Sequence, residues 1–243
     1  MSGHSHFKTI KAQKGIADAK RGKVFSKVGK LIAIAAKNGP DPITNPKLRV
    51  AIEQAKEVNM PKENVERAIK KGTGELAGES LEEVIFEGFG PGGTAIIIEG
   101  ITDNKNRTLG EIKQTLNQNN AKLAGEGAVK WLFERKGIII VDPKLQSESL
   151  QNKENLGLIA IETGADDIYW HQDALDVYTK PEELENIKKG LEVKGIKIES
   201  SSLGWVPKEE IAVDEKAKAN CQKLFEALDE NDAVQEIYSN LKD

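Results

Sequence analysis

The sequence predicts a multi-domain α and α+β protein: a three-helix N-terminal domain followed by two small α+β sandwich domains, one inserted in the other. Three observations predict it. The chain has 243 residues, more than a typical single domain. Apolar residues recur at helical spacing up to residue 77, and strand-length apolar runs alternate with helical patterns afterwards. Charge divides at the same point, because residues 1–77 hold 16 Lys and Arg against 7 acids and residues 78–243 hold 19 against 32.

A strongly basic amphipathic helix is predicted near the start of the N-terminal domain, which we place at residues 1–77. Residues 8–37 include nine Lys or Arg and one acid. Spacings of three and four residues bring four lysines onto one helical face: Lys20, Lys23, Lys27 and Lys30. An apolar row runs beside them, so the helix would bury one face and present a cationic one.

Two shorter helices complete this domain. Asn45 is placed to cap the second helix, with Pro46 in its first turn. The third helix opens at Pro61, and Gly72 is placed to end it. This last helix has a second basic cluster, consisting of Lys62, Arg67, Lys70 and Lys71.

The first α+β domain is predicted to be discontinuous, over residues 78–136 and 208–243. Its first part has, in order, strands over 84–89 and 94–102, a helix over 104–119 and a strand over 128–134. That part lacks a second helix and a fourth strand for a sandwich. A helix within 208–229 and a strand at 234–238 would supply them.

The second α+β domain is predicted as an insertion over residues 137–207. It has, in order, an apolar run at 137–141, a helix around 150–163, a strand at 175–179, a helix from Pro181 and a strand over 197–205. These elements form a small sheet with two helices on one face.

Motifs for catalysis are missing from the sequence. Gly88, Gly90 and Gly93 match G-x-G-x-x-G, but a strand follows instead of the helix that a dinucleotide fingerprint needs, which favours a hairpin turn. The single cysteine, Cys221, lies in step with apolar residues of a predicted helix. We therefore expect no catalytic residue, no metal site, no cofactor and no small-molecule substrate, and a protein that is not an enzyme.

The segment from Thr102 to Thr108 allows two interpretations. Polar side chains gather there where a strand passes into a helix, which favours capping of the free backbone N–H groups. The alternative is an anion site at the helix start, formed by Asn104, Lys105 and Arg107.

The basic N-terminal domain points to an anionic partner. A solvated helix face is the simpler interpretation, but the cation density is high and the rest of the chain is acidic, which favours a polyanion. A membrane is disfavoured, since no apolar run approaches the roughly 20 residues that span a bilayer. With no signal-peptide pattern and one cysteine, we expect a cytoplasmic protein.

Six segments of the sequence resemble the YebC/PmpR family, which includes the mitochondrial translational activators. They are GHS, IKAQKGIADAKRGKVFSK, NMPKENVERAIKKGTGE, EGFGPGG, TDNKNRT and VQEIYSN, in the family's order from residue 3 to 240. The resemblance implies three domains, one of them interrupting another. The chain departs from the family pattern at two positions. It has His6 and Phe7 where the family pattern has a lysine followed by a tryptophan.

The resemblance implies a DNA-binding transcription regulator or, alternatively, a ribosome-associated translation factor that binds ribosomal RNA and assists elongation on difficult sequences. We find no array of base-reading side chains on the basic helix, so contacts to the nucleic-acid backbone are expected. The predicted nucleic-acid-binding residues are Lys8, Lys11, Lys14, Lys20, Arg21, Lys23, Lys27, Lys30, Lys62, Arg67, Lys70 and Lys71. The expected partners are duplex DNA or ribosomal RNA, the latter within the ribosome.

Overall fold

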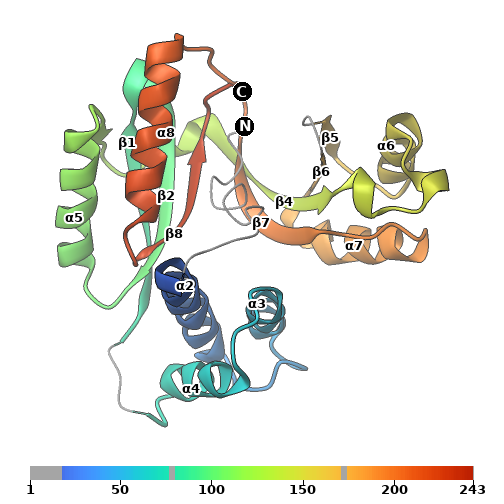
Figure 1. Cartoon of the computed structure of the whole chain (residues 1–243), viewed down its shortest axis with the longest axis horizontal. Helices are drawn as coiled ribbons and strands as arrows, with labels where there is room; N and C mark the ends of the chain where they lie inside the picture. The colour runs from blue at the N-terminus through green and yellow to red at the C-terminus, as the bar shows by residue number, and fades with distance from the viewer. Residues whose placement is uncertain (1–17, 77–79, 171–173, 243) are drawn as a thin grey trace. The chain divides into compact units, whose positions relative to one another are not determined.

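The computed structural model describes residues 18–76, 80–170 and 174–242 (Figure 1). It confirms the predicted fold class, with a helical region followed by two four-stranded sheets and their helices. The described chain divides into two compact units. One runs up to Val129 and includes Val213–Ile237, and the other combines Lys130–Ala212 with the residues from Tyr238 onward. The boundaries predicted at 77, 136 and 207 stay predictions.

Between residues 18 and 76 the structure describes three helices: α2 (Asp18–Ala36), α3 (Pro46–Glu57) and α4 (Lys62–Gly72). They enclose a core that includes Val28, Ile32, Leu48, Ala55 and Ala68. Asn45 caps α3 as predicted, because its side-chain oxygen accepts the Leu48 N–H at 3.1 Å. Its amide nitrogen also donates to the Ala35 carbonyl at 2.8 Å, which ties the start of α3 to the end of α2.

Gly72 ends α4, but not for the predicted reason. A terminating glycine adopts positive φ, and the glycines with positive φ in this chain do not include Gly72. A β-carbon at Gly72 would instead overlap the Ala33 carbonyl oxygen and lie 2.8 Å from the Ala36 β-carbon. Gly72 is therefore a point at which α4 approaches the backbone of α2 closely.

The first sheet combines strands from distant parts of the sequence. Its order is β3 (Lys122–Leu123), β1 (Glu82–Phe89), β2 (Ala95–Thr102) and β8 (Val234–Ser239). Two helices, α5 (Lys105–Gln118) and α8 (Glu215–Asp229), lie side by side against it (Figure 1). The C-terminal segment thus supplies the missing strand and helix, as predicted. The glycine-rich segment is a turn before β2, with Gly92 at φ 72°, which confirms the interpretation against a dinucleotide fingerprint.

The second sheet lies entirely between residues 133 and 207. Its order is β5 (Asp167–Trp170), β6 (Leu175–Thr179), β4 (Phe133–Val141) and β7 (Ser200–Pro207), all antiparallel. Helices α6 (Lys153–Glu162) and α7 (Leu184–Val193) cover one face. The core between them contains Ile139, Val177, Leu156, Ile187 and Leu191.

The strand predicted at residues 128–134 is wrong. A 3₁₀ turn occupies Lys130–Leu132, and Phe133 begins β4, which belongs to the second sheet. The buried carboxylate of Glu87 accepts the Gly127 N–H at 2.6 Å and the Val129 N–H at 2.8 Å. This side chain satisfies backbone donors that a strand would have paired with a neighbouring strand. The segment resembles a strand through its β-branched and aromatic residues, Val129, Trp131 and Phe133.

An ion pair between β4 and the turn before β5 makes the stability of the unit that contains Lys130–Ala212 depend on pH. Lys136 Nζ lies 2.6 Å from Asp166 Oδ2. Hydrogen bonding and charge from Lys136 lower the pKa of Asp166. Burial opposes the charged form of Lys136, but Asp166 and Glu134 outweigh it and raise the pKa of Lys136.

We expect Asp166→Asn to destabilise the protein at neutral pH and not in acid. A carboxylate with a depressed folded pKa stabilises above its unfolded pKa of about 3.9, and that stability is lost as pH falls through the folded pKa. Urea unfolding at pH 7 and below pH 3 checks this. An Asp166→Asn deficit that persists unchanged below pH 3 would contradict an electrostatic origin.

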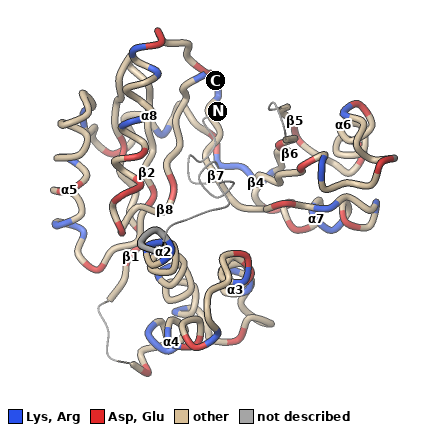
Figure 2. Tube along the Cα trace, viewed as in Figure 1, with Lys and Arg blue, Asp and Glu red and all other residues tan. Residues whose placement is uncertain are grey.

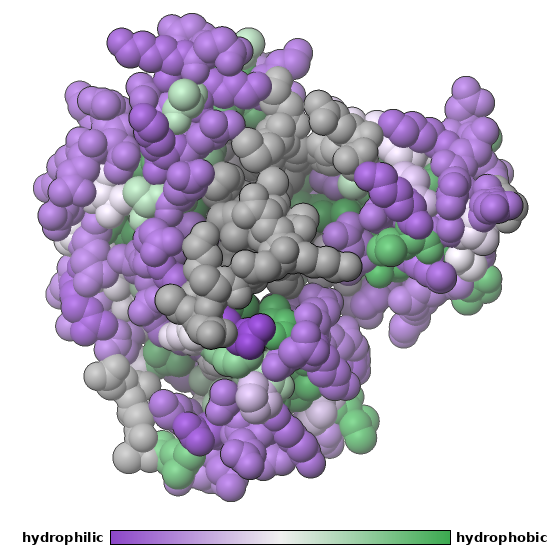
Figure 3. All heavy atoms as spheres, in the orientation of Figure 1, coloured by the Kyte–Doolittle hydropathy of each residue, from purple (hydrophilic) through white to green (hydrophobic). Residues whose placement is uncertain are grey.

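Hydrophilic side chains cover most of the described surface on the face shown in Figure 3. Within residues 18–76, 80–170 and 174–242, we find no helix with the length and apolar character to cross a bilayer.

Candidate nucleic-acid interface

Lys27, in the centre of the predicted cationic face of α2, is buried against the end of α8. Its side chain is 2% exposed. Its Nζ lies 2.6 Å from Asp229 Oδ1 and also donates to the Asp229 carbonyl oxygen at 2.9 Å. Asp229 is the last residue of α8, where carbonyl groups without helical partners attract cations. The buried Lys27 side chain therefore pairs with a partly buried carboxylate and also caps the end of α8.

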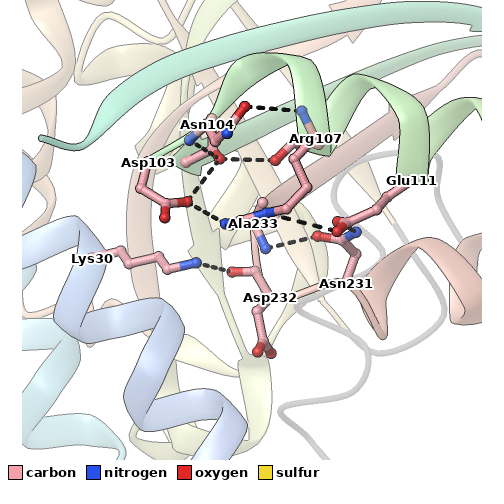
Figure 4. Close-up of polar contacts among 10 residues, drawn as sticks. Lys30, Asp103, Asn104, Arg107, Glu111, Asn231, Asp232 and Ala233 are labelled. Atoms are coloured by element: carbon pink, nitrogen blue, oxygen red, sulfur yellow. Dashed lines mark hydrogen bonds and ion pairs between the residues drawn. The ribbon is translucent and has the colours of Figure 1, made fainter. Parts of the chain in front are cut away.

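The two neighbouring lysines meet the same acidic end. Lys23 Nζ lies 2.8 Å from Glu230 Oε2, and Lys30 Nζ donates to the Asp232 carbonyl oxygen at 2.9 Å (Figure 4). Burial lowers the pKa of Lys30, against the opposing charge of Asp232. Lys23, Lys27 and Lys30, which were predicted to meet a polyanion, thus contact an acidic segment of the chain itself, which we call the acidic end of α8 (residues 229–232).

A groove opens between α2 and α4 on another face of the helical region. Its volume is about 790 Å³, and it extends to the described residues 80 and 81 after α4. Small residues of α2, among them Gly22, Ser26, Gly29 and Ala33, line one side. Four cations also line it: Lys30, Lys37, Arg67 and Lys71. None of the described residues that line the groove is acidic.

The second basic cluster lies on α4, beside this groove. Figure 2 shows Lys and Arg positions in blue along α4. Lys62, Arg67, Lys70 and Lys71 are all exposed. Lys62 pairs loosely with Glu66 at 3.6 Å, one turn along the helix. Lys70 and Lys71 lie in the last turn of α4, where the helix dipole favours cations without any ligand. Arg67 and Lys71 also line the groove, so part of the cluster faces it.

The remaining predicted cations are Lys8, Lys11, Lys14, Lys20 and Arg21. Arg21 is exposed near the start of α2. Lys8, Lys11 and Lys14 lie outside the described residues, as does the side chain of Lys20.

The geometry from Thr102 to Thr108 favours capping. Asn104 accepts the Arg107 N–H at 3.0 Å, and Thr102 Oγ1 accepts the Asn104 N–H at 3.0 Å. Arg107 forms ion pairs with Asp103 and, more loosely, with Glu111 at 3.9 Å (Figure 4). The helix start and its arginine thus have partners within the chain. The anion site of Asn104, Lys105 and Arg107 stays a prediction.

Comparison with models of protein families shows to which family the chain is related. A family model for the TACO1/YebC protein N-terminal domain matches residues 5–75, and one for the TACO1/YebC second and third domain matches residues 81–241. The chain belongs to the TACO1/YebC family. This confirms the resemblance seen in the sequence motifs.

Relatives of this TACO1/YebC protein match it over nearly its whole length. A protein of Geobacter sulfurreducens is 45% identical over 241 residues, which cover 99% of this chain and 95% of the relative. One of Halothermothrix orenii is 46% identical, with 99% and 94% covered. Both are named probable transcriptional regulatory proteins. The crystal structure of a conserved hypothetical protein from Aquifex aeolicus is similar, with a TM-score of 0.87, 45% identity and coverage of 98% and 97%.

Sequence reasoning missed the partner of the lysine row in this TACO1/YebC protein. The acidic end of α8 is about 200 residues away along the chain. The signal was present as DEND, a dense group of acids directly after a predicted amphipathic helix. Its charge complements the row, but no pattern in the sequence indicates that the two elements meet.

Proposed function

We propose that this TACO1/YebC family member is a nucleic-acid-binding regulator that holds the phosphate backbone of duplex DNA along the groove between α2 and α4. One observation carries the proposal: four cations and no acid among the described residues that line the groove. The names of the relatives agree with a regulatory role.

The groove is a better candidate for the phosphate backbone than the row of lysines beside it. Lys27 is the centre of that row, and it is buried in an ion pair with Asp229, so it is not exposed to a phosphate. Arg67 and Lys71 are exposed, and Lys37 donates to the Leu81 carbonyl, an uncharged group that does not neutralise its charge. Glycines and a serine on α2 would let a backbone come close to the helix.

Contacts of this kind position a nucleic acid without reading its bases. Amide and guanidinium side chains read base edges, and among the described groove residues only Asn64 and Arg67 have them. We therefore expect binding that depends on salt and only weakly on sequence.

The triple variant Lys37→Gln, Arg67→Gln, Lys71→Gln should weaken binding to duplex DNA and flatten its salt dependence. Each phosphate contact contributes about 0.9 to the slope of log affinity against log salt, so three lost contacts should reduce it by up to about 2.7. Fluorescence anisotropy with a labelled duplex at several salt concentrations measures both effects.

The matched control is the triple variant Lys47→Gln, Arg49→Gln, Lys56→Gln. All three residues lie on α3. These three cations are exposed and do not line the groove, and the control removes the same net charge. We expect it to lower the slope far less. Equal losses from both variants would mean general charge attraction and would overturn the groove as the binding site.

A second candidate is a ribosome-associated translation factor that uses the same groove on ribosomal RNA. The scarcity of base-reading side chains favours it, because a backbone-binding groove suits an RNA helix as well. Co-sedimentation with ribosomes in excess duplex DNA, at physiological salt, separates the two. Pelleting that persists and depends on Lys37, Arg67 and Lys71 would place ribosomal RNA ahead of DNA.

A further inference from the structure

The groove between α2 and α4 contains an aromatic ring as well as cations. Phe25 of α2 lines it and is half-buried. The same side chain packs against the core of the helical region, which holds the ring in place. Apolar residues from α4 and from the segments before and after it also line the groove: Met60, Ala68, Leu76 and Leu81. A phosphate backbone alone would leave this apolar surface in contact with water.

Glycines leave space around the Phe25 ring along α2. Residues three and four positions apart are neighbours on a helix, so Gly22 and Gly29 lie one turn before and one turn after Phe25. Both glycines line the groove, and a β-carbon at either would meet nothing within 4 Å. Glycine inside a helix is destabilising relative to alanine, and the close packing that requires Gly72 is missing at these two positions. The ring is therefore uncovered in both directions along the helix.

Two cations of the groove are available to an anion. Arg67 and Lys71 of α4 are exposed and line the groove. Glu75, the acid that follows α4 in the sequence, accepts the Thr73 hydroxyl at 3.1 Å and is not among the residues that line the groove. The described part of the groove therefore combines aromatic, apolar and cationic surface without an opposing carboxylate.

This combination fits a whole nucleotide better than a phosphate backbone alone. The volume of about 790 Å³ lies within the range of about 300–1,000 Å³ that is typical of small-ligand pockets. Every base has a π-face that stacks on aromatic rings, while lysine and arginine contact phosphates. A paired base is stacked inside its duplex and cannot reach Phe25. An acidic peptide would contact the cations, but the open space beside a flat ring suits the flat face of a base.

We propose that the groove holds one unpaired nucleotide, whose base stacks on Phe25 while Arg67 and Lys71 contact its phosphates. The inference rests on the proposed function, since both use the same groove, and it adds the class of nucleic acid that the groove selects. An unpaired base costs the least to move out of the stack. The groove should therefore favour a duplex with a bulged nucleotide over an unbroken one.

Fluorescence anisotropy with three labelled duplexes tests the site. One duplex is unbroken, one has a single unpaired adenine, and one has an abasic nucleotide at the same position. The full chain should bind the adenine bulge about 5- to 100-fold more tightly than the abasic bulge, the contribution typical of one stacked base. Both bulges have the same backbone, so phosphate contacts and the flexibility of the bulge cancel in this preference.

Two variants should abolish the preference for adenine by different routes. Phe25→Leu keeps an apolar side chain against the core but removes the ring. Gly29→Leu keeps the ring and should cover it, because a helical side chain lies over the turn before its own Cα. It also replaces a helical glycine, so a weakened helix could not explain its effect. Phe89→Leu is the control, because Phe89 is exposed in the same compact unit and does not line the groove.

The outcomes separate this inference from the proposed function. If the chain binds the unbroken duplex through Lys37, Arg67 and Lys71 but does not distinguish adenine from the abasic nucleotide, the nucleotide site is overturned and the proposed function stands. If binding of no duplex depends on these cations, the proposed function fails and this inference with it. Equal loss of the preference from Phe25→Leu and Phe89→Leu would also overturn the site. A peptide of alternating Glu and Leu that bound more tightly than the adenine bulge, and depended on Phe25, would assign the groove to an acidic protein partner and overturn it.

Discussion

Asp229→Leu should lower the free energy of unfolding of the unit that contains α2 and α8 by about 3–5 kcal/mol, because it strands a buried charge. Lys27 is 2% exposed and its Nζ lies 2.6 Å from the lost carboxylate. The carbonyl of residue 229 would still accept one hydrogen bond, but it carries no charge to offset the ammonium group. Urea unfolding at pH 7, followed by circular dichroism, measures the loss.

Two matched variants separate burial from charge. Glu230→Leu breaks the Lys23 ion pair, whose carboxylate is 71% exposed, and surface pairs contribute about 0–1 kcal/mol. Lys27→Met, Asp229→Leu removes both charges and should recover much of the lost stability, since apolar residues can replace a buried pair at little cost. If Asp229→Leu destabilised no more than Glu230→Leu, Lys27 would not be buried against α8.

The ion pair of Lys27 with Asp229 also decides which residues should be replaced to test nucleic-acid binding. Lys27 belongs to the row of lysines with which a binding face was predicted. Replacing it would alter the contact of α2 with α8 and the charge of the surface together, so lost affinity could come from either. Lys37, Arg67 and Lys71 avoid this ambiguity, because they are exposed.

Local patterns in the sequence predicted helices and strands well where the deciding interactions are between residues close together in the chain. Asn45 caps its helix, and the strand over 175–179 has the observed bounds, because caps and apolar periodicity are local effects. The cap of α5 was expected at Thr102 or Asp103, whereas Asn104 provides it. The two-residue strand β3 and the short β5 have too few residues for a detectable period.

The candidate site depended on contacts that no local pattern contains. Helical spacing correctly placed Lys23, Lys27 and Lys30 on one face, but it cannot say which element covers that face. The groove likewise arises only when α4 approaches α2 at Gly72, and its cations come from both helices. Spacing along one helix therefore indicated a cationic face and missed the groove beside it.

Gly72→Ala should destabilise the helical region by about 2–3 kcal/mol, although alanine is the better helix former. The new β-carbon would overlap the Ala33 carbonyl oxygen, and neither backbone can yield without moving a helix. Displacing α4 also moves Arg67 and Lys71 relative to Lys37, so duplex binding through the groove should weaken. Thermal unfolding and duplex titration of the same preparation measure both effects.

Gly29→Ala is the matched control, since Gly29 lines the same groove within α2 and a β-carbon there would meet nothing within 4 Å. The same substitution should therefore raise stability by about 0.5–1 kcal/mol, the gain expected when alanine replaces glycine inside a helix. Opposite signs for two identical substitutions would show that close packing at Gly72 sets the geometry of the groove. Stabilisation by both would mean that α4 does not contact α2 at Gly72, and the spacing of the groove's cations would then need another cause.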